Sequence, residues 1–170
     1  MSGRQVRCAA ADVSYPPDDG AIAAAVICSD ARYATVVDQR TVHLTEVEPY
    51  RPGEFYRREL PALRAVLADD GPLDLLIVDG YVDLDPDGRP GLGAHAHTEF
   101  AVPVIGVAKT AFATATHAVP VHRGQATRPL YVTAAGIPLS KAADLVRAMA
   151  GAHRLPDALR LVDRLTRPPT

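Results

Sequence analysis

Leu75-Leu76-Ile77-Val78-Asp79-Gly80 is a run of aliphatic residues that ends in a carboxylate and a glycine. A near-continuous apolar run, here beginning at Leu73, is typical of a strand at the centre of a sheet that is covered on both faces. A side chain at the tip of such a strand is held rigidly and still reaches solvent. The stretch therefore predicts a central strand over 73–78, with Asp79 at its accessible end.

A second strand of this kind lies near the start of the chain, where residues 6–13 are mostly apolar and include Asp12. A third carboxylate, Glu59, falls in a helix predicted over 55–68. One Asp at a strand end is usually a turn former or a cap, but three carboxylates that converge form a cage for Mg²⁺ or Mn²⁺. A cation held there makes bound water a better nucleophile and neutralises charge on a phosphate. The three carboxylates together predict a metal-dependent nuclease.

The other segments predict an α/β domain that covers the whole chain, 1–170. We expect strands over 21–28, 33–45, 102–108 and 130–134, and helices over 92–100, over 140–150 with Ser140 as its cap, and from 156 onward. Short turns between the first three strands favour an antiparallel meander, and later strands that alternate with helices favour parallel pairing. The predicted fold class is a ribonuclease-H-like mixed sheet, three antiparallel strands then parallel strands, flanked by helices.

Composition narrows the class of protein. The 170 residues are 48% hydrophobic and 22% charged, as is ordinary for a globular domain. The formal net charge of −2 gives no overall attraction to nucleic acid, so binding would need a local basic face. Cys8 and Cys28 fall in predicted strands and are expected to be buried, reduced thiols. With no signal peptide and no apolar run of membrane-spanning length, we expect a cytoplasmic location.

Two more side chains stand where they can act on a nucleic acid. Tyr50 lies in the turn Pro49-Tyr50-Arg51-Pro52-Gly53, whose prolines restrict the backbone. Its ring can stack on a base, an interaction worth about 1–3 kcal/mol, or pack on the sheet edge as an ordinary turn tyrosine. Lys109 follows the strand over 102–108, where it can stabilise charge on a phosphate or simply mark an exposed strand end.

Two other metal-binding patterns are incomplete. Residues 83–88 (DLDPDG) are similar to the start of a calcium loop, but Ala94 stands at the twelfth position, where a bidentate Glu is needed. We expect a solvated acidic turn there. His95 and His97 form a His-x-His pair, and no third ligand stands near them in the sequence to complete a zinc site.

Seven segments, taken in order, resemble the endonuclease V family, the nucleases that cut near deaminated bases such as inosine. They are AADVSY at 10–15, PYRPG at 49–53, RELPAL at 58–63, IVDG at 77–80, LGAHAH at 92–97, IGVAK at 105–109 and RLP at 154–156. The spacing of PYRPG and the following Glu-x-Pro is specific, and IGVAK adds to it.

The resemblance implies a role for each matching residue. Asp12, Glu59 and Asp79 would be the metal-binding carboxylates, for Mg²⁺ or Mn²⁺, and Lys109 would lie near the scissile phosphate. The residues implied to contact nucleic acid are the wedge Pro49, Tyr50, Pro52 and Gly53, the base-pocket residues Leu92 and Gly93, and His97. The implied activity is hydrolysis of the second phosphodiester bond 3′ to inosine in DNA or RNA, as in repair of deaminated bases.

The sequence departs from the family pattern in three places. Tyr81-Val82-Asp83 follows IVDG, where the family usually has His-Gly. Gly136 is followed directly by Ile137, where the family usually has a histidine. The family's N-terminal helix of about thirty residues is also missing. These departures leave a second interpretation open: a non-catalytic, nucleic-acid-binding relative that kept the fold.

Overall fold

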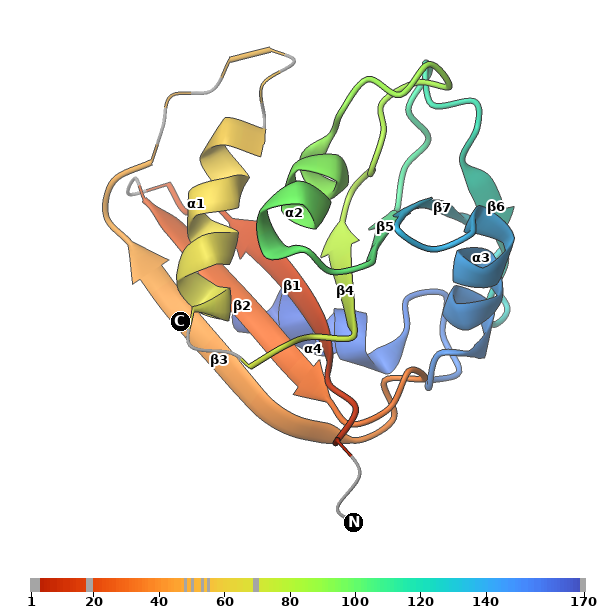
Figure 1. Cartoon of the computed structure of the whole chain (residues 1–170), viewed down its shortest axis with the longest axis horizontal. Coiled ribbons are helices and arrows are strands. Elements are labelled where there is room, and N and C mark those ends of the chain that lie inside the picture. The colour runs from red at the N-terminus through yellow and green to blue at the C-terminus, as the bar shows by residue number, and fades with distance from the viewer. Residues whose placement is uncertain are drawn as a thin grey trace.

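The computed structural model describes residues 4–17, 20–47, 49, 51–52, 54, 56–68 and 71–168. They form a mixed seven-stranded sheet with helices on both faces (Figure 1). The strands are β1 (Cys8–Ser14), β2 (Ala21–Cys28), β3 (Val36–Leu44), β4 (Leu75–Asp79), β5 (Val104–Ala108), β6 (Val119–Val121) and β7 (Leu130–Ala135). Their order across the sheet is β3-β2-β1-β4-β5-β7-β6.

Strand direction changes across the sheet. β1, β2 and β3 form an antiparallel meander. β4 runs parallel both to β1 and to β5. β7 then returns antiparallel to β5, and β6 pairs antiparallel with β7. The carboxyl ends of β1, β4 and β5, three neighbours, therefore meet at one end of the sheet.

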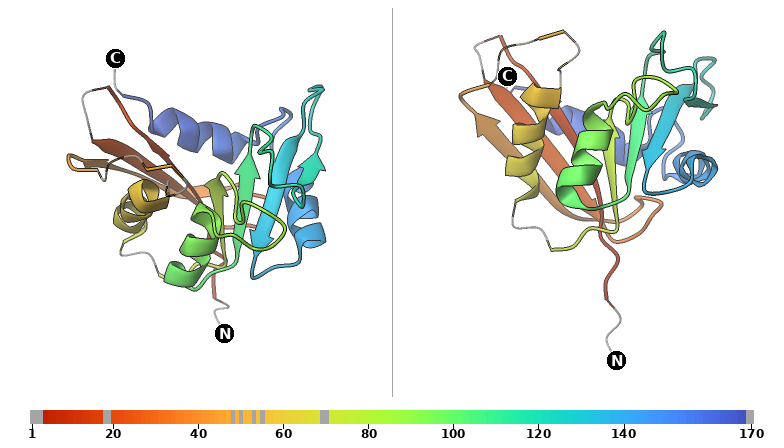
Figure 2. Two further views of the ribbon diagram at one scale, coloured as in Figure 1. Left: turned by 90° about the horizontal axis from the view of Figure 1, so that it is seen from above. Right: turned by 45° about the horizontal axis from the view of Figure 1, so that its top comes forward.

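The helices cover the sheet in two layers (Figure 2). One face carries α1 (Tyr56–Leu67) and α2 (Leu92–Phe100), and the other carries α3 (Leu139–Ala148) and α4 (Asp157–Leu165). Because successive strand side chains point to opposite faces, β4 contributes to both cores. Leu76 and Val78 pack with the α1 layer, and Ile77 packs with Val162 of α4.

The predicted fold class is confirmed, with corrections in detail. The strand predicted over 130–134 is β7, and it is antiparallel to its neighbours rather than parallel. β6 was not predicted, because three residues with a central proline carry no strand pattern. Ser140 is not a cap: it lies inside α3, whose cap position is Pro138.

Two expectations that follow from composition can be compared with the structure. Cys8 and Cys28 are 1% and 0% exposed and both are free thiols, as predicted. Among the described residues, no helix combines the length and the apolar character that crossing a membrane requires.

Candidate active site

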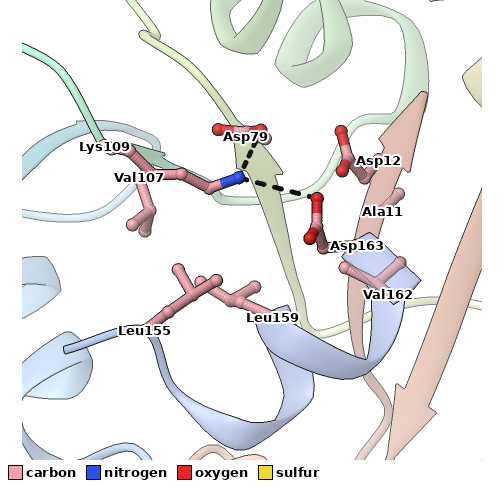
Figure 3. A pocket seen from close by; sticks show the side chains of 9 residues that line it. All are labelled: Ala11, Asp12, Asp79, Val107, Lys109, Leu155, Leu159, Val162 and Asp163. Atoms are coloured by element: carbon pink, nitrogen blue, oxygen red, sulfur yellow. Dashed lines mark ion pairs between the residues drawn. The ribbon is translucent and has the colours of Figure 1, made fainter. Parts of the chain in front are cut away.

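Two of the predicted carboxylates and the predicted lysine lie together at the carboxyl end of the parallel strands. Ala11 of β1 pairs with Val78 of β4, so the next residues, Asp12 and Asp79, stand on neighbouring strands. Lys109 directly follows β5, the next strand across. All three side chains line one hollow beneath α4 (Figure 3). Strand order and side-chain alternation therefore bring them together.

The ammonium group of Lys109 lies between two carboxylates. Its Nζ is 3.6 Å from Oδ2 of Asp79 and 3.7 Å from Oδ1 of Asp163 (Figure 3). Asp163 belongs to α4 and was not predicted as a site residue. One signal could have found it: it directly follows Val162, so it borders the buried stripe of an amphipathic helix. A carboxylate in that position lies at the edge of the contact between α4 and the sheet and is only partly exposed to solvent.

A small cavity lies among these side chains. Its volume of about 10 Å³ is close to what a single water molecule needs. Asp12, Asp79 and Asp163 stand on one side of it, and Leu155 and Leu159 close the other (Figure 3). The space suits one small ion or water, with oxygen ligands on one side only.

Glu59 approaches the same end of the sheet from the opposite layer. It projects from α1, and its side chain is buried, at 8% exposure. Burial raises the pKa of Glu59 well above its ordinary value, and the charges of Asp12 and Asp79 raise it further. No hydrogen bond to the Glu59 carboxylate occurs within the described part of the chain. A buried acid without a hydrogen-bond partner is costly unless a cation compensates its charge.

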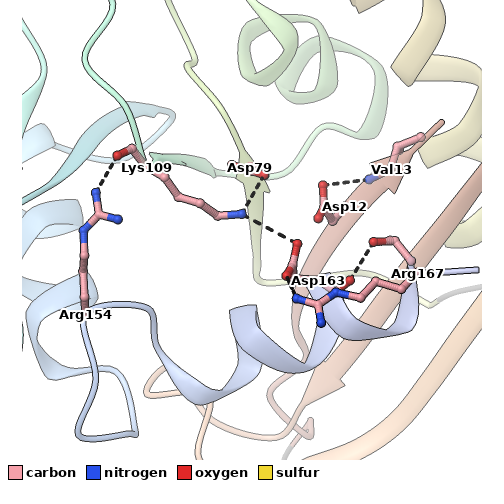
Figure 4. A network of polar contacts seen from close by, with 8 residues as sticks. Asp12, Val13, Asp79, Lys109, Arg154, Asp163 and Arg167 are labelled. Carbon is pink, nitrogen blue, oxygen red and sulfur yellow. Dashed lines mark hydrogen bonds and ion pairs between the residues drawn. The ribbon is translucent and has the colours of Figure 1, made fainter. Parts of the chain in front are cut away.

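Burial, together with the charges of neighbouring groups, changes the ionisation of the carboxylates and of Lys109. Burial, together with the charge of Asp79, raises the pKa of Asp12 to about 7, although the Val13 N–H donates a 2.8 Å hydrogen bond to it (Figure 4). Burial also raises the pKa of Asp79, and the Lys109 ammonium partly offsets that rise. Burial lowers the pKa of Lys109, but Asp79, Asp163 and Asp12 outweigh it, so that pKa is raised. One ammonium group does not neutralise this cluster.

The carboxylates at this end of the sheet are suitable ligands for a hard divalent cation, although in this structure they do not surround a common position. Among the residues that the structure describes, no three Asp, Glu, His or Cys side chains are placed to hold a metal ion together. Glu59 comes from the other layer, and the Lys109 ammonium occupies the space between Asp79 and Asp163. The donors are nevertheless all carboxylate oxygens with excess negative charge, which is what Mg²⁺ and Mn²⁺ prefer. The Lys109 ammonium is the positive charge that lies between Asp79 and Asp163 in this structure.

A second, larger pocket adjoins the carboxylates on the α1 and α2 side. Its volume is about 290 Å³, and it is lined by Tyr56, Glu59, Asp79, Gly80, Tyr81, Leu84, Pro90, Gly91, Leu92 and Phe112. Tyr56 is stacked on His95, with ring centroids 3.7 Å apart, and the Tyr81 and Phe112 rings lie 5.9 Å apart. Flat aromatic and aliphatic walls suit a planar ring such as a nucleobase. We call this the apolar pocket.

Of the predicted base-pocket residues, Leu92 lines the apolar pocket and Gly93 does not. Gly93 is buried against Val82: a Cβ on it would lie 2.6 Å from Val82 Cγ2, so the glycine allows close packing of α2. His97 is also placed elsewhere. Its Nδ1 lies 2.7 Å from the carbonyl oxygen of Val102, which precedes β5, whereas Lys109 follows β5. The expected contacts of Gly93 and His97 with nucleic acid stay predictions.

The predicted wedge turn is only partly covered. Tyr50 and Gly53 lie outside the described residues. Pro49 and Pro52 are both exposed, and Pro49 lines a hollow that it shares with Tyr15 and Arg58. The wedge remains a prediction.

Comparison with known proteins places this chain in one family. The family model for Endonuclease V matches residues 2–136. Endonuclease V of Azotobacter vinelandii is 34% identical to this chain, over 92% of this chain and 80% of the relative. The chain belongs to the endonuclease V family.

Solved endonuclease V structures share the fold. The protein from Streptomyces avermitilis superposes with a TM-score of 0.79 at 28% identity, covering 95% of this chain and 80% of that one. Endonuclease V from Ciona intestinalis, solved in complex with a DNA that contains an inosine, gives a TM-score of 0.78 at 18% identity, covering 96% and 84%. At that lower identity the likeness concerns the fold alone.

Proposed function

We propose that this chain is a metal-dependent endonuclease that hydrolyses a phosphodiester bond 3′ to a deaminated base, such as inosine, in DNA or RNA. The observation that carries the proposal is the position of Asp79. It lines both the carboxylate cavity and the apolar pocket. A base in the pocket would therefore place a nearby phosphate of its own strand beside the carboxylates.

The chain's own residues have distinct roles in this proposal. Asp12, Glu59 and Asp79 would hold Mg²⁺ or Mn²⁺, and the bound cation supplies a Lewis acid for water and phosphate. Lys109 would put its ammonium on a phosphate oxygen. Leu92 and the aromatic walls of the apolar pocket would bind the base and exclude water. Tyr50 would separate that base from its neighbour.

A second candidate is a non-catalytic relative that binds nucleic acid. The specific observation in its favour is the Lys109 ammonium, which forms ion pairs with Asp79 and Asp163. In that case the Lys109 ion pairs would be a permanent structural feature. Binding would then occur without cleavage, and divalent cations would not change it.

A nicking assay tests the first proposal against the second. Oligonucleotides with and without one inosine are incubated with the wild type, Asp79→Asn and Asp144→Asn, in Mn²⁺ and in chelator. Asp144 lies on α3, is 77% exposed and serves as the matched control. We expect inosine-dependent cleavage by the wild type and by Asp144→Asn in Mn²⁺, and none by Asp79→Asn. Cleavage by Asp79→Asn at the wild-type rate contradicts the endonuclease proposal. Binding without any cleavage supports the non-catalytic relative.

A further inference from the structure

A large basic groove begins at Lys109 and follows α4. Its volume is about 650 Å³, and it is lined by Lys109, His153, Arg154, Leu155, Arg160, Asp163, Arg164 and Arg167. Five of these side chains are Lys or Arg and one is a carboxylate. In a chain of net charge −2, this is a local concentration of positive charge, and such a concentration attracts a polyanion. We call it the basic groove.

The arginines of α4 are available to a ligand. Arg160 and Arg164 are exposed, and neither forms an ion pair or side-chain hydrogen bond within the described part of the chain. They are one helical turn apart, about 6 Å along the axis, and so project from one side of α4. Arg167 is paired with Asp163 at 3.1 Å but keeps 70% of its side chain exposed. Two arginines are therefore free to bind, and a third stands next to them.

The wall of the groove is held in place by another arginine. Arg154 donates a hydrogen bond to the carbonyl oxygen of Lys109 (Figure 4). It also donates to the carbonyl oxygens of Arg128 and Pro129. These bonds fix the segment before α4 to the end of β5. The arginines of α4 are thereby kept at a constant position relative to Lys109, as a continuous binding surface requires.

The basic groove is continuous with the candidate active site. Lys109, Leu155 and Asp163 line both the groove and the carboxylate cavity, and Asp79 lines both that cavity and the apolar pocket. Apolar pocket, carboxylate cavity and basic groove therefore follow one another in series. A single strand with its base in the apolar pocket and its phosphate at the carboxylates would enter the groove beyond Lys109.

We propose that the basic groove binds the phosphodiester backbone of the substrate strand on the far side of the scissile phosphate from the base in the apolar pocket. This inference rests on the proposed function. The arginine guanidinium presents a planar fork of donors that matches phosphate oxygens. The contacts carry no sequence information, so they position the strand rather than select it.

Binding of two oligonucleotides tests the inference. Both are single-stranded, fluorescein-labelled and contain one inosine; the long one continues well beyond the cleavage position, and the short one ends there. Fluorescence anisotropy is measured over a range of NaCl concentrations in chelator, so that nothing is cut. The proteins are the wild type, Arg160→Ala/Arg164→Ala, and Lys141→Ala/Arg147→Ala on α3, which removes the same charge outside the groove.

We expect the α4 variant to lose affinity for the long oligonucleotide by on the order of tenfold, with a salt slope smaller by about 1.4, since each lost phosphate contact on a single strand removes roughly 0.7. Its affinity for the short oligonucleotide should match that of the α3 variant. Equal affinity and salt slope of both variants on the long oligonucleotide would overturn the inference alone. A wild type that binds neither oligonucleotide contradicts the proposed function as well. Equal melting temperatures of the variants show that the fold is retained.

Discussion

The Lys109 ammonium lies 3.6 Å from a carboxylate oxygen of Asp79, at the place where two adjacent strands end. The same group lies 3.7 Å from Asp163 of α4. The ion pairs of Lys109 therefore connect the ends of β4 and β5 to α4. They partly neutralise the carboxylates, which a divalent cation could also do. Under the proposed function, a metal ion would compete with the lysine for this position, and that competition leads to separate expectations for each residue.

Replacement of Lys109 separates its effects on metal binding and on catalysis. In Lys109→Ala the carboxylates lose their internal cation, so Mn²⁺ should bind more tightly in the absence of nucleic acid, as measured by titration calorimetry. Cleavage should fall by roughly 10²–10³-fold because one donor to the phosphate is lost. Lys141→Ala, on the surface of α3, should change neither. Weaker Mn²⁺ binding in Lys109→Ala contradicts the competition.

Glu59→Gln should make the metal-free protein more stable near neutral pH. The raised pKa of Glu59, caused by burial and by Asp12 and Asp79, means that folding must either take up a proton at this acid or bury its charge, and glutamine requires neither. The melting temperature should rise by roughly 2–4 °C for each kcal/mol of stability gained. Added Mn²⁺ should stabilise the variant less than it stabilises the wild type. A variant that melts lower than the wild type and responds fully to Mn²⁺ would show that Glu59 is structural.

The raised pKa of Asp12 predicts a pH dependence with a definite sign. Its value of about 7, against an ordinary 3.8, means that the folded state favours the protonated acid. The contribution of Asp12 to stability is therefore fully present below about pH 4 and is lost as pH rises to about 7. The metal-free wild type should lose stability across this window, and Asp12→Asn should lose less. The free energy of unfolding is measured by urea denaturation at a series of pH values. If it depends on pH in the same way in both proteins, the raised pKa of Asp12 is contradicted.

Arg123 holds the segment that leads into α4. It is 7% exposed, and its guanidinium donates to the carbonyl oxygens of Met149, Gly151, His153 and Arg154. Arg123→Ala leaves these acceptors without a partner and should lower the free energy of unfolding by about 3 kcal/mol or more. Arg123→Lys should rescue little, because a single ammonium cannot reach all four. If urea denaturation of Arg123→Ala shows a decrease of less than about 1 kcal/mol in the free energy of unfolding, these hydrogen bonds contribute little to stability.

Much of the site could be predicted because it lies at strand ends. Asp12 and Asp79 end apolar runs, and parallel strands bring such ends together. Asp163 is not at a strand end. The amphipathic pattern of α4 places it beside the buried stripe, but which side chains it faces depends on how α4 packs against the sheet. The contact of the His97 ring with the Val102 carbonyl oxygen could not be predicted either, because it depends on how α2 packs beside β5.

The fold shows the same division. The meander and the buried central strands follow from short turns and apolar runs, whereas the direction of β7 depends on a long connection from β5 that carries little pattern. The three residues of β6, with a proline in the middle, are too short for any periodicity. Local sequence predicts elements well when they are long and buried, and poorly when they are short or paired by distant segments.

The most direct test of the central claim is a crystal structure of this protein soaked in Mn²⁺, with anomalous scattering used to locate the ion. We predict an anomalous peak bounded by the carboxylates of Asp12, Glu59 and Asp79, with the Lys109 ammonium moved away from Asp79. No peak at that end of the sheet at saturating Mn²⁺, with Lys109 still between Asp79 and Asp163, would contradict a metal-dependent active site in this chain.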